Sequence, residues 1–448
     1  MDDRPGMAEK FAFFSGVWGG VLMGAGSGFL LLYLTDIVGL GAAAVGTLML
    51  VARVADGASD PIMGYLVDHL PPTRWGRFRP YVLVGAVLCV CCVIALFVVP
   101  ALLPDALVAL WITYLLWGLL LDLFQIPMTS LVPAMSADQG ARGQLAAIVG
   151  VTGLFAAALA TGLTLPVVNL LGGGTRGWLT YVIGSAILGF CLVVVMVLRV
   201  RERVVPLSPE RYRLSDVRRV FFSGRAVPIL LLSKVSVQAA GGALTAAMPY
   251  FFLYYIGDTV YLSAAAFVMA IPMVAGAVAV PVLARRAGAK PLYVASLGVS
   301  ITGLAALMAV PPDPVPVLAC FALTGVGLGG AVSLSLVLLA ELTDYTEWKH
   351  GFRTEASLAA MTSFATKAGG GVGGGLLAYT LALTGYRSGG VAQSEETLDG
   401  ILMAQSLVPA GIGLVGALAF LLYPISGEVA REASRRLAER RTAVVEPA

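Results

Sequence analysis

Apolar residues dominate the chain in runs of about 20 to 30 residues, which short polar segments containing glycine or proline separate. About twenty apolar residues form a helix long enough to cross the hydrocarbon core of a bilayer. The pattern therefore predicts an all-α membrane protein with twelve transmembrane helices. The expected spans are 10–38, 42–70, 79–101, 106–134, 142–170, 177–199, 226–256, 259–284, 290–311, 314–342, 354–385 and 399–424.

Positive charge is distributed unevenly between the segments that separate these spans. Of the 29 lysines and arginines, Arg176 and Arg387 lie in loops on one side, and Arg53, Lys234 and Lys367 lie inside spans. All the others lie in the N-terminus, the tail and the loops of the opposite side. Since basic loops stay in the cytoplasm, both termini are expected there. The polar start MDDRPGMAEK has no signal-peptide pattern, so the protein is expected in the cell (plasma or inner) membrane, as a multi-pass protein.

The chain divides near its middle at a long, arginine-rich connection. The segments that follow the fourth and tenth spans, LVPAMSADQGARGQLAA and LLAELTDYTEWKHGFRTEASLAA, echo each other. Such repeats are typical of secondary transporters, with the site near midplane at the repeat interface. Two pseudo-symmetric six-helix bundles are therefore expected. The expected domains are 1–199, a linker at 200–225, 226–424, and a tail at 425–448.

Composition excludes several other classes of protein. Hydrophobic residues make up 58% of the chain and charged residues 12%, against about 25% charged residues in soluble domains. The net charge of +3 gives no indication of nucleic-acid binding. There is no phosphate-binding loop, and both histidines, His69 and His350, lie at the expected cytoplasmic face. We therefore expect neither an enzyme nor a bound cofactor.

The most informative stretch lies in the second span, LVARVADGASDPIMG. Arg53, Asp56 and Asp60 are spaced i, i+3, i+7, so they share one helix face, and Ser59 stands beside Asp60. A charge inside the bilayer costs about 2.5–3.5 kcal/mol on insertion scales. Two carboxylates and a hydroxyl predict a site for a small cation or a proton. The alternative is that Arg53 neutralises one acid in a buried ion pair.

The fourth span carries a further acid. Asp122 and Gln125 are three residues apart, and Pro127 follows them. If the second and fourth spans pack together, Asp122 joins the cation site, with Thr129 one turn beyond Gln125. The alternative is an interhelical hydrogen bond of structural value only.

Two lysines lie within spans of the second half. Lys367, in the glycine-rich eleventh span, requires a carboxylate partner or an anionic ligand, which predicts a place at the central site. Lys234 lies nearer the cytoplasmic start of the seventh span, where its side chain either reaches the interface or takes part in the site.

A third group of charges surrounds the expected cytoplasmic ends of the spans, and Arg53 is placed with it as a coupling residue. Opposite charges on the two halves would close an inner gate and exchange partners when it opens. The alternative is charge that only sets the topology. The other candidate gating residues are Asp68, Arg142, Asp344, Glu347 and Arg353.

Several motifs resemble one known family. KFAFFSGVWGG, the DPIMG segment, RWGRFRPYVLVG and ELTDYTEWKHGFRTEA resemble the glycoside–pentoside–hexuronide:cation symporter family of the major facilitator superfamily. The resemblance implies that Asp56 and Asp60 are the cation-binding acids, with Ser59 and Asp122 at further ligand positions. It also implies that Lys367 lies near both the cation and the solute.

The departures from the family pattern concern the solute. Val21 replaces an acid that holds the sugar, Gln125 and Thr129 replace an Asp and a Trp of the fourth-span motif, and Gly150 replaces a sugar-contacting Arg. The galactoside site is therefore not retained. A branch of sodium-dependent lysolipid transporters is also similar in keeping the cation acids and the lysine. The more apolar positions suit an amphiphilic or less hydroxylated solute.

These observations predict a symporter that couples Na⁺ or H⁺ to the movement of a small organic solute, a glycoside or an amphiphile, across the membrane by alternating access. The cation would bind Asp56, Ser59, Asp60 and Asp122, with Asp56 and Asp60 as the Na⁺ ligands. The solute would contact Trp18, Gln125, Thr129 and Lys367. Expected partners are the solute, the coupling cation and the lipid bilayer, with the protein as a monomer. The alternatives are a cation-driven exporter of a lipophilic metabolite and a membrane sensor or scaffold.

Overall fold

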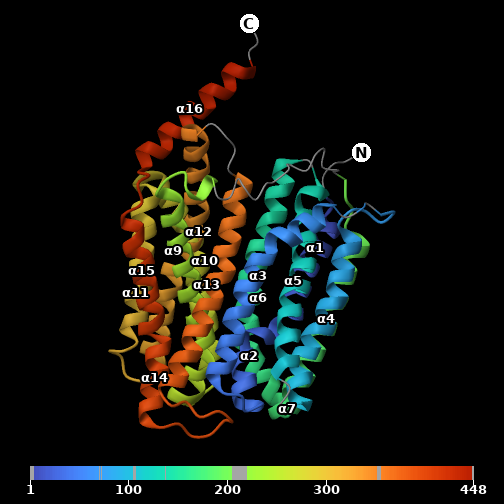
Figure 1. Ribbon diagram of the computed structural model, residues 1–448, viewed down its shortest axis with the longest axis vertical. Helices are drawn as coiled ribbons and strands as arrows, with labels where there is room; N and C mark the ends of the chain where they lie inside the picture. Colours follow the sequence, from blue (N-terminus) through green and yellow to red (C-terminus); the bar gives the residue numbers. More distant parts are fainter. Residues whose placement is uncertain are drawn as a thin grey trace. The chain divides into compact units, whose positions relative to one another are not determined.

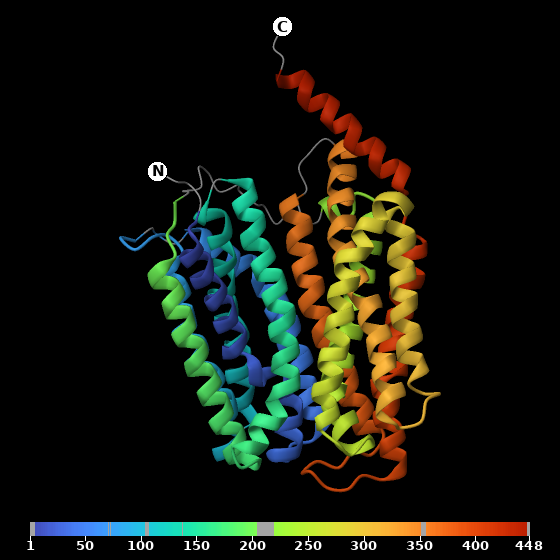
Figure 2. The same cartoon turned by 180° about the vertical axis from the view of Figure 1, so that it is seen from behind.

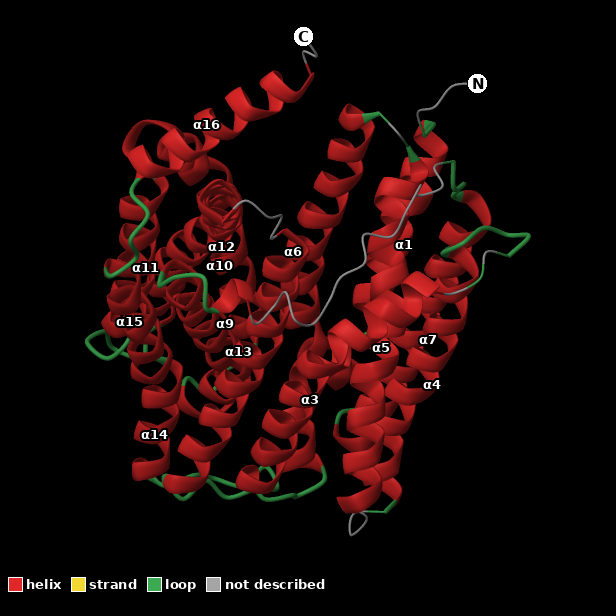
Figure 3. Cartoon of the chain, turned by 45° about the horizontal axis from the view of Figure 1, so that its top comes forward, coloured by secondary structure: helices red, strands yellow, loops and turns green. Residues whose placement is uncertain are grey.

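The computed structural model describes residues 5–69, 71, 73–103, 107–136, 138–203, 219–350 and 355–445, with some side chains inside the helices left undescribed. Every regular element among these residues is a helix (Figures 1 and 3). An isolated bridge between Thr73 and Gly76 is the one strand-like pairing in the described part of the chain. The predicted all-α class is confirmed.

The helices follow the predicted apolar runs closely. In the first part of the chain they are α1 (Met7–Met23), η1 (Ala25–Phe29), α2 (Leu30–Leu32), η2 (Tyr33–Ile37), α3 (Ala42–His69), α4 (Arg79–Leu102), α5 (Leu107–Met135), α6 (Gln139–Leu170) and α7 (Gly174–Arg199). In the second part they are α9 (Ala226–Tyr250), η3 (Phe251–Tyr255), α10 (Val260–Ala287), α11 (Ala289–Ala306), α12 (Pro314–His350), α13 (Glu355–Leu383), α14 (Glu395–Gln405), α15 (Leu407–Leu421) and α16 (Gly427–Val445).

Nine helical segments within the described residues are long and apolar enough to cross a membrane. The predicted second, fifth and eleventh spans also form helices, α3, α6 and α13, but they are not among the nine. Twelve crossings therefore stay a prediction. The twelfth predicted span is broken at Ser406, because Pro409 has no N–H to donate to the carbonyl four residues earlier.

The chain forms two compact units. Unit 1 contains Met1–Glu210 together with Phe252–Phe267 and Leu381–Thr397, and unit 2 contains Arg211–Phe251, Val268–Thr380 and Leu398–Ala448. The core of unit 1 is built by side chains of α1, α4, α5, α6 and α7, and that of unit 2 by side chains of α9, α11, α12, α13, α15 and α16. Figure 2 shows the same helices from behind.

Glycine allows the helices within each unit to pack with their backbones close together. In unit 1 a methyl group on Gly19 of α1 would lie 2.5 Å from the carbonyl oxygen of Gly189 in α7. In unit 2 a methyl group on Gly373 of α13 would overlap the carbonyl oxygen of Ala239 in α9. Such contacts are typical of helices that associate in a bilayer, where apolar side chains gain little by leaving lipid.

Two helices change geometry near one end. The first membrane segment passes from α1 through a 3₁₀ turn, η1, to a π-helical turn, η2, and α9 likewise continues into the π-helical turn η3. A glycine with positive φ follows each π turn, Gly39 at 85° and Gly257 at 79°. Other residues rarely adopt such backbone angles, so these glycines set the direction in which the chain leaves each helix.

Candidate functional site

Two buried carboxylates lie at one interface within unit 1. Asp56 of α3 is 6% exposed and Asp122 of α5 is 3% exposed. The α3 and α5 helices pack together, and a methyl group on Gly118 of α5 would lie 2.8 Å from Oδ1 of Asp56. Because Gly118 precedes Asp122 by one turn, the two acids lie on adjoining turns of the same interface. The structure thus brings together the acids of the second and fourth predicted spans.

Arg53 supplies the positive charge beside this pair. Its Nη1 lies 3.8 Å from Oδ2 of Asp56, and its guanidinium lies 5.8 Å from the centre of the Trp117 ring. Asp122 and Tyr114 also interact with Arg53 electrostatically. One guanidinium therefore serves two carboxylates, which leaves the group with a net negative charge when both acids are ionised. Such a group attracts a monovalent cation in a medium that screens charge poorly.

Ser59 and Asp60 continue the same helix. Ser59 is half-buried, and its Oγ donates a hydrogen bond of 2.8 Å to the backbone carbonyl of Asp56, which leaves the lone pairs of the hydroxyl oxygen available as an acceptor. Asp60 lies in α3 one turn after Asp56, but its side chain lies outside the described residues. Among the described side chains, no group of three or more His, Cys, Asp and Glu residues is placed to hold a metal ion.

The predicted solute contacts of unit 1 lie on α1 and α5. Gln125 and Thr129 are exposed and one turn apart, and Thr129 donates to the backbone carbonyls of Gln125 and Ile126. Gln125 is therefore exposed, whereas Asp122, only three residues earlier in α5, is buried. Trp18 of α1 is half-buried and touches the ring of Phe14.

The predicted gating residues are described only in part. Asp344 and Glu347 are half-buried in α12, whereas the side chains of Asp68 and Arg142 and the whole of Arg353 lie outside the described residues. An unexpected contact lies nearby, because Arg436 of α16 stands 5.8 Å over the ring of Trp348. The tail helix thus packs on the α12 segment that carries the predicted gate.

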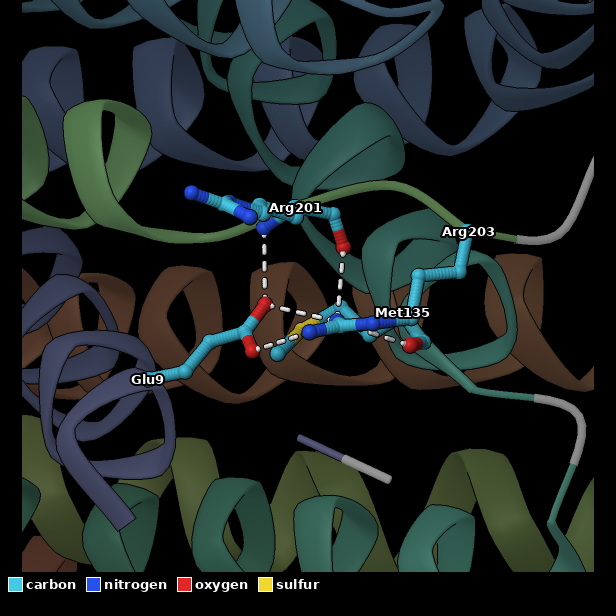
Figure 4. Close-up of polar contacts among 4 residues, drawn as sticks. All are labelled: Glu9, Met135, Arg201 and Arg203. Atoms are coloured by element: carbon cyan, nitrogen blue, oxygen red, sulfur yellow. Dashed lines mark hydrogen bonds and ion pairs between the residues drawn. The ribbon is translucent and has the colours of Figure 1, made fainter. Parts of the chain in front are cut away.

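A charged clamp that the sequence pattern did not indicate lies just beyond the end of α7. Glu9 of α1 accepts hydrogen bonds from the backbone N–H of Arg201 (2.7 Å) and from both terminal nitrogens of Arg203 (2.9 and 2.8 Å), as Figure 4 shows. Arg203 also donates to the carbonyl of Met135, at the end of α5. A charge pair far apart in sequence gives no local pattern, so composition alone cannot find it. We call Glu9, Arg201, Glu202 and Arg203 the linker clamp.

Glu202 completes the clamp at the start of α4. Its carboxylate accepts the backbone N–H groups of Arg77, Phe78 and Arg79 at 2.7 to 2.9 Å. The N–H of Arg79, the first residue of α4, belongs to the positive end of the helix dipole, which a carboxylate stabilises. Gly76, with φ of 118°, leaves room for it, since a methyl group there would lie 2.5 Å from Oε1 of Glu202. The glycine of the RWGRFRP motif is therefore required for this contact between Glu202 and the start of α4.

At the other end of the first membrane segment, Asp36 joins three parts of unit 1. Tyr254 of η3 and Tyr386, beyond α13, both donate their hydroxyl groups to its carboxylate, one to each oxygen. Beside them the backbone N–H of Gly389 donates to the carbonyl of Thr35 (3.0 Å), and the hydroxyl of Ser388 donates to that of Leu40 (2.9 Å). We call Asp36, Tyr254 and Tyr386 the Asp36 cluster.

Replacing Tyr386 by Phe is expected to lower the thermal unfolding midpoint by several degrees. The change removes one of two hydroxyl donors to Oδ1 of the half-buried Asp36, the other being Thr35, and a hydrogen bond to a charged group contributes about 1.5–3 kcal/mol. Tyr254→Phe should have a similar effect, and the double variant should lose less than the sum because the two share one partner. Thermal unfolding of the purified protein in detergent measures the shift.

The control is Tyr261→Phe, in α10. Tyr261 is half-buried and makes no hydrogen bond to any side chain that the structure describes, so this change should leave the midpoint unchanged. Equal midpoints for all three single variants would show that the Asp36 cluster contributes nothing to stability.

The chain is similar to known transport proteins along most of its length. The family model described as MFS/sugar transport protein matches residues 13–427. The isoprimeverose transporter of Lactiplantibacillus pentosus is 30% identical over 89% of this chain and 84% of its own length. The glucuronide carrier protein homolog of Escherichia coli (strain K12) is 29% identical over 95% of this chain and 92% of its own length.

Solved structures agree at the level of the fold. The crystal structure of the nucleoside transporter NupG superimposes with a TM-score of 0.63 and 15% sequence identity, and it covers 93% of this chain and 98% of its own. At that identity the likeness concerns the fold alone, and together with the family model it confirms the expected all-helical major facilitator fold.

Proposed function

We propose that this chain, which belongs to the MFS/sugar transport protein family, couples the movement of Na⁺ or H⁺ to that of a small organic solute. The family and its named relatives make the chain a membrane transporter and not an enzyme, and they confirm the resemblance seen in its motifs. Cation coupling, twelve crossings with both termini in the cytoplasm, and a monomeric state are parts of the proposal.

The observation that carries the coupling is the buried pair of Asp56 and Asp122 with Arg53 beside it. Ionised acids are costly inside a membrane protein unless a charge partner accompanies them. We propose that the coupling cation is that partner, bound by Asp56, Asp60 and Asp122 with the hydroxyl of Ser59 as a neutral oxygen ligand. Oxygen ligands suit Na⁺, and closely spaced carboxylates that cannot all ionise would equally accept a proton.

The proposed role of the cation is to neutralise these acids so that the protein can change conformation by alternating access. Coupling requires the cation and the solute each to favour the state that binds the other. Lys367, half-buried in α13, would link the two sites through its charge. No cofactor is needed beyond the transported cation.

The proposed solute is a glycoside or sugar derivative, because the two relatives named above are a transporter of isoprimeverose and a glucuronide carrier homolog. Trp18, Gln125, Thr129 and Lys367 are the proposed contacts. A methyl group on Gly150 would meet no atom within 4 Å, so that position leaves open space. Space and the apolar Val21 suit a solute with fewer hydroxyl groups than a galactoside, or an amphiphile.

Thermal unfolding of the purified protein against Na⁺ concentration tests the cation site, for wild type and Asp60→Asn at about pH 5.5, 7 and 8.5, because a ligand of the folded state raises the midpoint by mass action. We expect Na⁺, and not K⁺, to raise the midpoint at the two higher pH values, and the variant to lose this response. Stabilisation on acidification that Asp60→Asn reproduces would identify H⁺ instead. A protein that responds to neither cation would contradict the proposal.

A further inference from the structure

One face of α9 in unit 2 is polar and open. Lys234, Gln238, Gly241 and Thr245 are spaced i, i+4, i+7 and i+11, which places them on one side of the helix. The first three are half-buried and Thr245 is exposed, and a methyl group on Gly241 would meet nothing within 4 Å. These residues lie inside the membrane-crossing segment Ala226–Tyr255, so lipid is an unsuitable neighbour for this face.

A matching face follows α13 in the same unit. Ser363, Lys367, Gly370 and Gly374 have the same spacing, i, i+4, i+7 and i+11. Ser363 is exposed, Lys367 and Gly370 are half-buried, and a methyl group on either glycine would meet nothing within 4 Å. Each helix thus carries one lysine on a polar, open face.

The two faces adjoin along a glycine seam. A methyl group on Gly369 would lie 2.8 Å from Cβ of Gln238, and one on Gly242 would lie 2.8 Å from the carbonyl oxygen of Gly370. Later residues of α13 contact later residues of α9, since Gly369 lies against Gln238 and Gly373 lies against Ala239 and Ala243, so the two helices run parallel. Lys234 comes four residues before Gln238, and Lys367 comes two residues before Gly369, which places the two lysines at similar depth.

Lys234 has no ion pair or hydrogen bond with any side chain that the structure describes. It lies eight residues after the start of α9 at Ala226, or about 12 Å along the axis at the rise of an α-helix. An ammonium group in such a place requires an anion or water. The Gln238 amide, one turn further on, supplies additional N–H donors on the same face.

We infer that Lys234, Gln238 and Lys367 form an anion-binding subsite that holds a carboxylate or sulfonate group of the transported solute. This inference rests on the proposed function, because it assigns the chemical class of its solute. Two ammonium groups at one depth attract a single oxyanion more strongly than either does alone, and a neutral sugar gains nothing from them. The solute is therefore an acidic sugar derivative, and Lys234 determines its specificity.

Three sugars with one ring test the inference: glucose, glucuronate and 6-deoxy-6-sulfoglucose, which differ only at C6. Thermal unfolding of the full chain in detergent, at constant Na⁺ and ionic strength, gives the concentration of each that half-saturates the shift. We expect the half-saturating concentration of at least one of the two acids to be lower than that of glucose by a factor of about ten or more. Whichever acid binds more tightly identifies the oxyanion, and both results support the subsite.

Lys234→Gln should remove this preference, raising the half-saturating concentration of the acid about tenfold and leaving that of glucose unchanged. Lys234→Arg, which keeps the charge, should retain most of the preference. The control is Lys349→Gln, which removes an exposed lysine whose described contact is with Tyr345. Wild type that binds all three sugars alike, or none of them, overturns the inference, and so does a Lys234→Gln variant that keeps the preference.

Failure of the subsite and failure of the proposed function give different results. If glucose binds as well as the acids and a Na⁺ or H⁺ gradient still drives its accumulation in vesicles, the subsite is wrong and the symporter stands. If the acids bind preferentially through Lys234 but no cation gradient drives their uptake, the subsite stands and the coupling fails.

Discussion

Asp56→Asn is expected to abolish cation-driven accumulation of the solute while leaving a folded protein that still exchanges it. Asp56, Asp122 and Arg53 together carry one net negative charge when ionised, and with a neutral amide in place of the first carboxylate the remaining pair carries none. The amide keeps the shape of the carboxyl group, so the packing against Gly118 is preserved. Loss of the charge should weaken the binding of the cation by at least tenfold, which corresponds to about 1.4 kcal/mol.

The measurement is uptake of labelled glucuronate into proteoliposomes, first with a Na⁺ or pH gradient and then as exchange without one. Asp258→Asn is the matched control, since Asp258 is exposed and its Oδ1 accepts the N–H of Val260 at the start of α10. Asn fills the same capping role, so both activities should be retained. Full gradient-driven accumulation by Asp56→Asn would exclude this acid from coupling.

Gly373→Ala should be strongly destabilising, whereas Gly374→Ala next to it should not. A methyl group on Gly373 would overlap the backbone oxygen of Ala239, which cannot move without separating α9 from α13. Overpacking of this kind costs about 1–3 kcal/mol. A methyl group on Gly374 meets no atom within 4 Å, and alanine favours a helix over glycine by about 1 kcal/mol.

The thermal unfolding midpoints of the two variants in the same detergent decide the matter. We expect the midpoint of Gly373→Ala to be several degrees below that of wild type, and the midpoint of Gly374→Ala to be equal to it or higher. Since the two substitutions are chemically identical and adjacent, general effects of alanine in this helix cancel between them. A common shift would mean that the α9–α13 seam is looser than the structure has it.

The positions of the helices followed from the sequence because the bilayer requires long, uninterrupted apolar runs. The predicted first span, 10–38, and the observed Met7–Ile37 differ by a few residues. The 3₁₀ and π turns within that segment were not predicted, since they preserve its apolar character. The break at Ser406 was not predicted either, although Pro409 was a visible signal.

The acids of the candidate site were predictable because a charge in an apolar run is costly and therefore conspicuous. The partnership of Asp56 with Asp122 needed only the packing of two helices. The partners of Asp36 were not predictable, because Tyr254 and Tyr386 lie more than two hundred residues away and tyrosine is common in membrane segments. The sequence could not decide whether Lys234 reaches the membrane interface or takes part in the site. That choice depends on how α9 packs on α13, which the spacing of residues along one helix does not show.

The linker clamp also constrains how this part of the chain can change its length. The clamp residues that follow Val200 are consecutive but bind two different partners. The backbone N–H of Arg201 and the side chain of Arg203 donate hydrogen bonds to Glu9. The carboxylate of Glu202, between them, accepts backbone N–H groups at the start of α4. Loss or gain of one residue at Val200 would present a guanidinium to the N–H groups of α4 in place of Glu202, and a gain would also present the carboxylate of Glu202 to Glu9. Insertions and deletions in the connection should therefore be tolerated only after Arg203.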